Sequence, residues 1–202
     1  MKLYFATGAC SVAVRIVLIE AGMAFDDSRV NTRTHLLADG GDYYAINPLG
    51  YVPLLELNDG THLTEGPAIV QYIADQVPEK NLAPANGTIE RAQMQGWLNF
   101  IGTELHKGFA PLFNPATPLE YKPMVIEKLL SRLAWVDSQL AGKHYLMGDA
   151  FTVADPYLFN VNNWAPLVKV DISGLANLAD FRARMLARPA VVAAMRAEGL
   201  MK

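Results

Sequence analysis

Cysteine is nearly absent from this chain, since Cys10 is the only one among 202 residues. One cysteine excludes an internal disulfide framework and fits a reducing compartment. It also argues against a zinc site built from several thiolates. The histidines His35, His62 and His144 have no metal-ligand spacing, so we expect no metal.

Long hydrophobic runs and an excess of one charge are also lacking. Although 51% of the residues are hydrophobic, none of the runs approaches the roughly 18 apolar residues that a membrane span needs. Lys and Arg total 17 against 20 Asp and Glu, without like-charge blocks, which argues against nucleic acid and membrane partners. Residues 1–8 lack the apolar stretch and cleavage site of a secretory signal, so we expect a cytoplasmic protein.

The first eighty residues predict a small α/β domain, residues 1–80, with the element order β-α-β-α-β-β-α. Alternation and helical spacing separate the strands from the helices, and Asn58-Asp59-Gly60 predicts a hairpin turn between the last two strands. The predicted elements are strands over 2–6, 25–30, 52–57 and 62–64, helices over 11–21 and 65–77, and a short helical piece between 42 and 47.

Residues 81–87 are predicted to be a linker because the stretch around them is polar and contains proline and glycine, which interrupt helices and strands. Beyond the linker, residues 88–202 show helical periodicity and no convincing strand. The predicted helices cover 88–110, 124–140, 152–168, 178–187 and 190–198. The second half is therefore expected to be an all-α helical-bundle domain.

Cys10 follows a strand and a glycine-containing loop and precedes a predicted helix. Its sulfur would lie at the N-terminus of that helix, where free N–H groups and the helix dipole favour the reactive thiolate. The alternative is a small buried core residue. Position alone leaves both interpretations open.

Val52-Pro53 lies just before the hairpin. Proline cannot donate to a strand ladder, so it indicates an edge, a bend or a cis peptide bond. A cis bond would expose the Val52 backbone to an extended peptide ligand. A plain proline at the start of a strand is the simpler alternative.

Thr64-Glu65-Gly66 opens a helix directly after a strand. The N–H groups of such a terminus can bind a carboxylate, and the Glu65 side chain could meet a ligand ammonium. Ordinary capping by Thr64 with an acid in the first turn is the competing interpretation.

Two further patterns lie in the second half. Polar side chains share one face of a helix: Asn99, Thr103, His106 and Lys107. Because Trp97, Ile101 and Leu105 would pack inward from the opposite face, a solvated stripe is the simplest account, and a site requires another domain over it. Thr152-Val153-Ala154-Asp155 has the form of a capping box, which stabilises a helix start and is not a catalytic signal.

Taken together, these features resemble the glutathione S-transferase family, and most closely its beta class. The matching stretches span nearly the whole chain in one order: Met1-Lys2-Leu3-Tyr4, Gly8-Ala9-Cys10-Ser11, Ala45-Ile46-Asn47-Pro48-Leu49-Gly50-Tyr51-Val52-Pro53, Leu63-Thr64-Glu65-Gly66, Trp97-Leu98-Asn99-Phe100, His106-Lys107, Phe151-Thr152-Val153-Ala154-Asp155 and Trp164-Ala165-Pro166. Any one stretch is weak, but the set is specific.

The resemblance implies a thioredoxin-like domain that binds glutathione, a helical domain with the pocket for a second substrate, and a homodimer. Glutathione is then a co-substrate, and no cofactor is expected. Cys10 would lie close to the glutathione sulfur, Val52 would pair with the cysteinyl part beside a cis Pro53, and Glu65 with Gly66 would hold the γ-glutamyl end. Asn99, Thr103, His106 and Lys107 would face the cleft between the domains, with His106 near the sulfur.

Two positions depart from the pattern of the family. The family often has a lysine where this chain has His35, and a neutral imidazole is a poorer partner for the glycyl carboxylate of glutathione. It often has a histidine where this chain has Leu167, which leaves the second-substrate pocket more apolar on that side.

The implied activity is stabilisation of the glutathione thiolate, which then attacks a small hydrophobic electrophile. One alternative is a glutathione-dependent thiol–disulfide or peroxide reductase or a dehalogenase that uses Cys10, without a second cysteine at a C-x-x-C spacing. Another is a protein that binds hydrophobic ligands without turnover.

Overall fold

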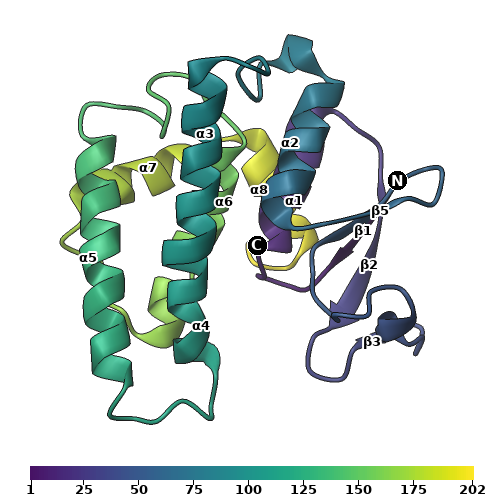
Figure 1. Ribbon diagram of the computed structural model, residues 1–202, viewed down its shortest axis with the longest axis horizontal. Helices are drawn as coiled ribbons and strands as arrows, with labels where there is room; N and C mark the ends of the chain where they lie inside the picture. The colour runs from purple at the N-terminus through teal and green to yellow at the C-terminus, as the bar shows by residue number, and fades with distance from the viewer. The chain divides into compact units, whose positions relative to one another are not determined.

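The computed structural model describes all 202 residues, which form two compact units (Figure 1). The first unit consists of Met1–Ala83 together with Arg188–Lys202, and the second consists of Pro84–Ala187. Each unit has its own core, and each is described by itself below. None of the helices is both long enough and apolar enough to cross a membrane.

The first unit is built on a five-stranded sheet with the order β3-β2-β1-β4-β5. The strands are β1 (Lys2–Phe5), β2 (Asp26–Asn31), β3 (Leu36–Leu37), β4 (Leu54–Glu56) and β5 (His62–Thr64). Only β1 and β2 pair in parallel, and α1 (Ser11–Ala21) supplies the crossover that a parallel pair requires. The mixed sheet and its helices form the expected thioredoxin-like domain.

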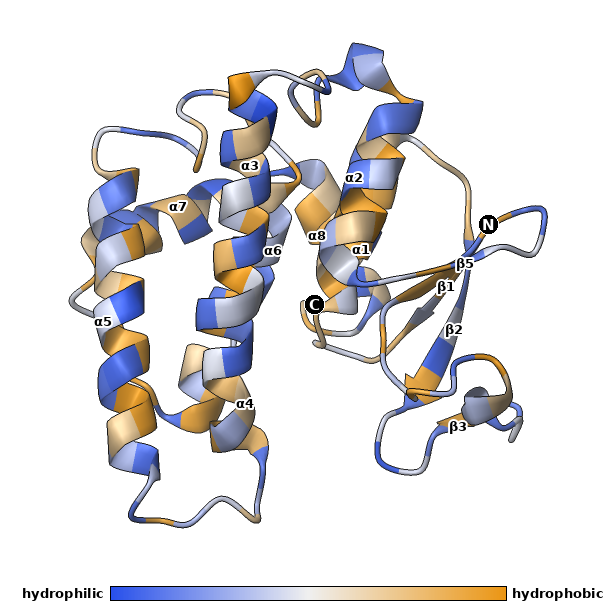
Figure 2. Cartoon of the chain, viewed as in Figure 1, coloured by the Kyte–Doolittle hydropathy of each residue, from blue (hydrophilic) through white to orange (hydrophobic).

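Side chains alternate between the two faces of the sheet. Leu3 and Leu55 are opposite each other in the β1–β4 register and fully buried, on the face covered by α1 and α2 (Gly66–Gln76). Tyr4 points the other way, into a second buried cluster with Tyr43 and further apolar residues. The sheet therefore has apolar packing on both faces, and Figure 2 shows hydrophobic residues along much of α2.

The predicted helical piece between residues 42 and 47 is only a single 3₁₀ turn, Tyr43–Ala45. Asp42 accepts a hydrogen bond from the Tyr44 N–H at 2.9 Å, which caps this turn without extending it. The prediction also missed β3, whose two residues are too few to show alternation.

The last helix, α8 (Pro189–Ala197), packs against α1 and belongs to the first unit. The sequence analysis assigned it to a helical domain over 88–202. Helical periodicity showed that α8 has an apolar face but could not show which domain buries that face. Arg188, at its start, is hydrogen bonded to Glu20 on α1 at 2.7 Å.

A buried ion pair joins the C-terminal segment to the rest of the first unit. The Arg15 guanidinium on α1 lies 2.6 Å from Asp27 and 3.0 Å from Glu198. The other carboxylate oxygen of Glu198 accepts from the Gly8 N–H at 3.0 Å. Residues 188–202 therefore hold the loop that precedes Cys10.

The second unit is all helical, as predicted. Its elements are α3 (Ile89–Phe100), a π-helical segment η3 (Ile101–His106), α4 (Lys107–Phe113), α5 (Lys122–Leu140), α6 (Ala154–Asn162), a 3₁₀ turn η4 (Ala165–Val168) and α7 (Ala176–Leu186). Apolar and polar residues alternate along α5 in Figure 2, and its buried positions recur every three or four residues. The helix predicted over 152–168 is divided between α6 and η4.

The capping box at the start of α6 is formed by Asp155, which is fully buried. Its carboxylate accepts from the Thr152 N–H at 2.7 Å and from the Thr152 hydroxyl at 3.2 Å. Its other oxygen accepts from the Leu146 N–H at 2.9 Å. Asp155 thus fixes both the helix start and the loop before it, as a stability signal should.

Candidate active site

Cys10 is the residue immediately before α1, so its sulfur lies at the N-terminus of that helix as predicted. The side chain is partly exposed, which sets it apart from a small core residue. The Cys10 thiol donates to the Val52 carbonyl with a sulfur–oxygen distance of 3.3 Å. This contact brings two segments 42 residues apart in the sequence to one place.

The Val52–Pro53 peptide bond is cis. The segment before it is fixed by two donors to the Tyr51 carbonyl, the Tyr43 hydroxyl and the Asn47 amide, each at 2.8 Å. A Cβ added to Gly66 would lie 3.6 Å from the Pro53 side chain, so the start of α2 lies against Pro53. Cys10, Val52, Pro53 and Gly66 are therefore contiguous within the first unit.

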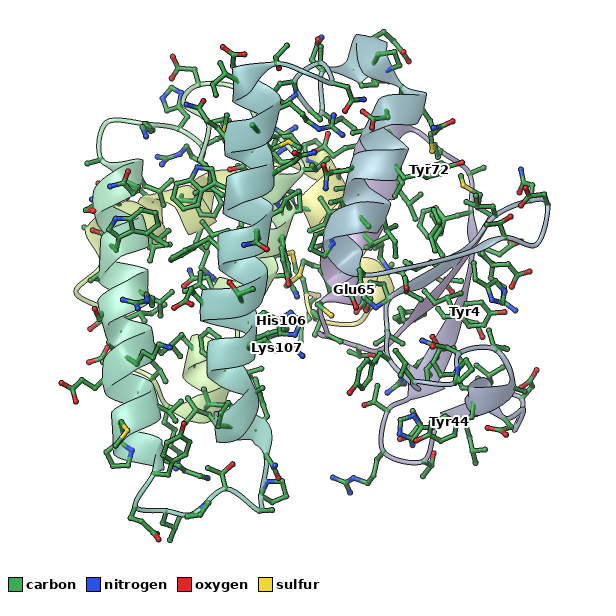
Figure 3. The ribbon with its side chains drawn as sticks, in the orientation of Figure 1. Tyr4, Tyr44, Glu65, Tyr72, His106 and Lys107 are labelled. Carbon is green, nitrogen blue, oxygen red and sulfur yellow. The ribbon has the colours of Figure 1, made fainter.

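Glu65 completes this row at the start of α2 (Figure 3). Its side chain is exposed, and its backbone has φ = 66°, a conformation that residues other than glycine rarely adopt. Such strain persists where the surrounding structure imposes it, and it is concentrated at functional sites. Glu65 is itself the N-cap, so the alternative of ordinary capping by Thr64 does not describe this terminus.

His35 lies elsewhere in the first unit, in the loop between β2 and β3. Its ring packs against Tyr44 with a centroid distance of 4.3 Å. A Cβ added at Gly50 would lie only 2.5 Å from Nδ1 of His35, and Gly50 has φ = 67°, so glycine is required there. Nδ1 is buried and has no hydrogen-bond partner in the protein.

The predicted polar face of the second unit is exposed at Asn99, Thr103 and Lys107 and half-buried at His106. The Thr103 hydroxyl is used within the helix, donating to the Asn99 carbonyl at 3.0 Å. Figure 3 shows His106 and Lys107 together where η3 meets α4. Trp97, predicted to pack inward, is only partly buried, whereas Ile101 and Leu105 are fully buried.

His106 has an apolar environment on one side and a single polar contact. Its Nδ1 lies 2.8 Å from the Tyr157 hydroxyl, and the Trp164 ring packs edge-on at 4.8 Å. Burial, with a smaller contribution from the neighbouring Lys107 charge, lowers the pKa of His106 to about 4. The imidazole is therefore neutral at pH 7.

Comparisons with known proteins place this geometry in a family. The family description "Glutathione S-transferase, N-terminal domain" matches residues 7–76, and "Glutathione S-transferase, C-terminal domain" matches residues 100–189. Glutathione S-transferase GstA of Escherichia coli O157:H7 is 49% identical over 200 residues, which cover 99% of this chain and all of that protein. The chain belongs to the glutathione S-transferase family.

Solved structures of bacterial glutathione S-transferases resemble the chain over its whole length. A sphingomonad glutathione S-transferase complexed with glutathione is 43% identical, with a TM-score of 0.95 over 99% of this chain and all of that one. The beta-class glutathione S-transferase of Sphingomonas chungbukensis is also 43% identical, with a TM-score of 0.96 over all of both chains. The resemblance to the beta class is confirmed.

Within this glutathione S-transferase, the first unit brings five predicted site residues into one row: Cys10, Val52, Pro53, Glu65 and Gly66. His35 lies on a separate loop of that unit, and Asn99, Thr103, His106 and Lys107 lie together on the second unit. The sequence analysis missed Tyr157, because nothing in its local pattern showed that its hydroxyl meets a side chain 51 residues away. No group of three or more metal-ligating side chains is present in the chain.

The sequence analysis also missed the π-helical segment of this glutathione S-transferase. The Lys107 N–H donates to the Gly102 carbonyl, five residues back, and so widens the helix at His106. Such π-helical segments are rare in proteins, but those that occur are frequently found at functional sites. A π-helical turn contains one more residue than an α-helical turn, and the spacing of apolar residues along a whole helix does not reveal a single such turn.

Proposed function

We propose that the protein is a glutathione S-transferase that conjugates glutathione to small hydrophobic electrophiles. The observation that carries the proposal is the row formed by Cys10, Val52, Pro53, Gly66 and Glu65 in the first unit. The row offers a thiol, a backbone edge, and a helix N-terminus with an acid, which are partners for the thiol, the peptide and the amino-acid end of glutathione. The relative solved with glutathione supports the same ligand.

Each part of glutathione has an assigned partner in this proposal. Val52 pairs through its backbone with the cysteinyl residue beside Pro53. The α2 N-terminus at Gly66 binds the γ-glutamyl carboxylate, and Glu65 binds its ammonium. His35 contacts the glycyl carboxylate. In the second unit, Asn99, Thr103 and Lys107 are the remaining polar groups that the family resemblance assigns to the ligand.

The chemistry is stabilisation of a thiolate followed by nucleophilic attack. The N-terminus of α1 favours the negative charge on the glutathione sulfur, which lowers its pKa, and so does the Cys10 thiol when it donates its one proton to that sulfur in place of the Val52 carbonyl. The family resemblance assigns the same role to His106. With an aryl halide, the sulfur forms a bond to the ring carbon and the halide leaves with the electron pair of the broken bond. Conjugates of this kind remove reactive compounds, and we propose detoxification as the role.

Replacing Cys10 with alanine separates the two roles that its thiol could have. Because Cys10 acts as a hydrogen-bond donor and not as the nucleophile, we expect Cys10→Ala to retain conjugation within about tenfold of the unmodified protein. The measurement is the steady-state rate of glutathione conjugation to a generic aryl halide. Complete loss of turnover with unchanged glutathione affinity would contradict this role, and no turnover by the unmodified protein would contradict the transferase itself.

A second activity is favoured by the partial exposure of Cys10 at the start of α1. A Cys10 thiolate can attack the glutathione sulfur of a mixed disulfide between glutathione and a substrate thiol, forming a disulfide between Cys10 and glutathione and releasing the substrate as a thiolate. A further glutathione then regenerates Cys10 and glutathione disulfide. This route requires a reducing compartment, which supports the cytoplasm as the location.

The protein is proposed to act as a homodimer, as the family resemblance implies. Support comes from a surface pocket of about 430 Å³ between α3, α5 and residues 143–148, lined by Trp97, Phe100 and Trp135. These rings pack against one another in edge-on and tilted contacts, and 44% of Trp135 is exposed. Aromatic side chains are typical of the buried centre of an interface, so a second copy of the chain would cover this face.

Sedimentation gives the test of the dimer. The unmodified protein should sediment as two 22.1 kDa chains, and Trp135→Arg should shift it toward one, because a charge would be buried in the interface. Leu119→Arg is the matched control, since Leu119 is also an exposed apolar residue but lies outside this pocket. A dimer unaffected by Trp135→Arg would place the interface elsewhere, and a monomeric unmodified protein would contradict the dimer.

A further inference from the structure

Tyr157 on α6 is the polar partner of His106, and neither the family resemblance nor the comparisons assign it a role. We propose that Tyr157 is a positioning residue that fixes the tautomer of His106, so that the ring presents an Nε2–H donor to an anionic ligand atom. The proposal rests on the proposed transferase function for the identity of that anion. The state of the ring itself does not depend on it.

The contact between the two side chains is short and rigidly held. The Tyr157 hydroxyl lies 2.8 Å from Nδ1 of His106, with the rings edge-to-face at a centroid distance of 5.9 Å. Only 5% of Tyr157 is exposed, and the hydroxyl also lies next to Gly102 in the π-helical segment. Tyr157 therefore has little freedom to move away from the imidazole.

The His106 ring is also held on its other sides. Trp164 packs edge-on against it at 4.8 Å with an interplanar angle of 70°. Trp164 is in turn held by edge-on contacts with Phe109 and Phe113. A rotation that moved Nδ1 away from Tyr157 would break the hydrogen bond and disturb this aromatic packing, so one ring orientation is favoured.

The direction of the hydrogen bond determines the chemistry of the opposite nitrogen. A neutral imidazole has one donor and one acceptor nitrogen. A phenol, with its acidic O–H, is a good donor to an imidazole lone pair, which makes Nδ1 the acceptor and leaves the proton on Nε2. In the reverse direction, Nε2 would be an acceptor and could only remove a proton.

The hydrogen bond from Tyr157 matters because the His106 ring is neutral and can therefore exist as either of two tautomers. Because burial keeps the ring from taking a second proton at pH 7, a hydrogen bond from Tyr157 is needed to select between the two neutral tautomers. An Nε2–H donor can stabilise a thiolate without itself being a strong acid that would return the proton to sulfur. An oriented dipole in a partly buried site is more effective than the same donor in water.

The tautomer can be measured directly on the full-length protein. Long-range ¹H–¹⁵N NMR spectra at pH 7 should show His106 with a protonated Nε2 and an unprotonated Nδ1, assigned by the missing signals in His106→Gln. Tyr157→Phe removes only the hydroxyl, and it should shift the His106 nitrogen signals toward a mixture of tautomers. A protonated Nδ1 in the unmodified protein would overturn the proposal, and so would His106 signals unchanged in Tyr157→Phe.

Kinetics then test whether Tyr157 acts through His106. Tyr157→Phe should lower kcat for conjugation by roughly 5- to 30-fold with the KM for glutathione within about twofold, because the loss concerns the charge on sulfur. In a His106→Ala background the same change should have less than about a twofold effect. An equal effect in both backgrounds would show a structural role independent of His106.

The experiments distinguish a failure of the proposed transferase function from a failure of the proposed positioning of His106. If the unmodified protein conjugated no electrophile while the NMR spectra gave the expected tautomer, the transferase function would be wrong and the positioning of His106 would stand. Thermal melting of Tyr157→Phe within a few degrees of the unmodified protein provides the control for folding. Conjugation that is normal in Tyr157→Phe would overturn the proposal even with the expected tautomer.

Discussion

Replacing Glu65 with alanine is expected to weaken glutathione binding by about 10- to 100-fold. The exposed carboxylate at the start of α2 is the partner proposed for the ligand ammonium, and a charge-assisted hydrogen bond contributes roughly 1.5–3 kcal/mol. Calorimetric titration with glutathione gives the affinity directly. Alanine also has a Cβ, so the strain at φ = 66° is common to both proteins and does not confound the comparison.

Two variants show whether the charge of Glu65 is responsible. Glu65→Gln keeps the size of the side chain and one acceptor oxygen, so its affinity should fall between those of the unmodified protein and Glu65→Ala. Glu79→Ala removes another exposed acid of the first unit, beyond the other end of α2, and should leave affinity unchanged. Equal affinity in Glu65→Ala and the unmodified protein would reject the proposed γ-glutamyl site.

Replacing Asp155 with alanine is expected to lower the free energy of unfolding by about 3–5 kcal/mol. The fully buried carboxylate accepts three hydrogen bonds from Leu146 and Thr152, and its removal leaves two buried N–H groups without that acceptor. For a chain of this size the change corresponds to a fall in the melting temperature of roughly 10 °C. Thermal unfolding followed by circular dichroism measures it.

Asp155→Asn is the matched control for that loss. Asparagine keeps one acceptor oxygen in the same place, so it should lose less stability than alanine does. Glutathione affinity should be nearly unchanged in Asp155→Asn, because the capping box stabilises α6 and is not part of the proposed binding row. A melting temperature of Asp155→Ala within about 2 °C of the unmodified protein would contradict the stabilising role.

The parts of the fold that were predictable have local causes. The helix over 11–21 was correct because Gly22, at φ = 70°, ends it. Ser11 is its first residue, but the Ser11 hydroxyl bonds to the Ala6 backbone and does not cap the helix. Asn58-Asp59-Gly60 gave the hairpin between β4 and β5 for the same kind of reason. The assignment of α8 to the second half failed, because the surface that buries a helix is a property of the whole fold and not of its periodicity.

The site shows the same division between local and distant causes. The position of Cys10 before a helix followed from its neighbours, whereas its hydrogen bond to the Val52 carbonyl joins segments whose proximity only the folded sheet creates. His106 was identified through its place on a polar helix face and the resemblance to the family. Tyr157 was not, because the register of η3 and the packing of α6 decide which side chain it meets.

The discontinuous first unit has a consequence for synthesis on the ribosome. The second unit is one continuous segment, residues 84–187, and all of it is made before α8 and Glu198. Until then Arg15 lacks its buried carboxylate partner and the Gly8 loop lacks its acceptor. The helical unit can therefore complete its fold on the nascent chain first, reversing the usual order in which the N-terminal domain folds before the one that follows.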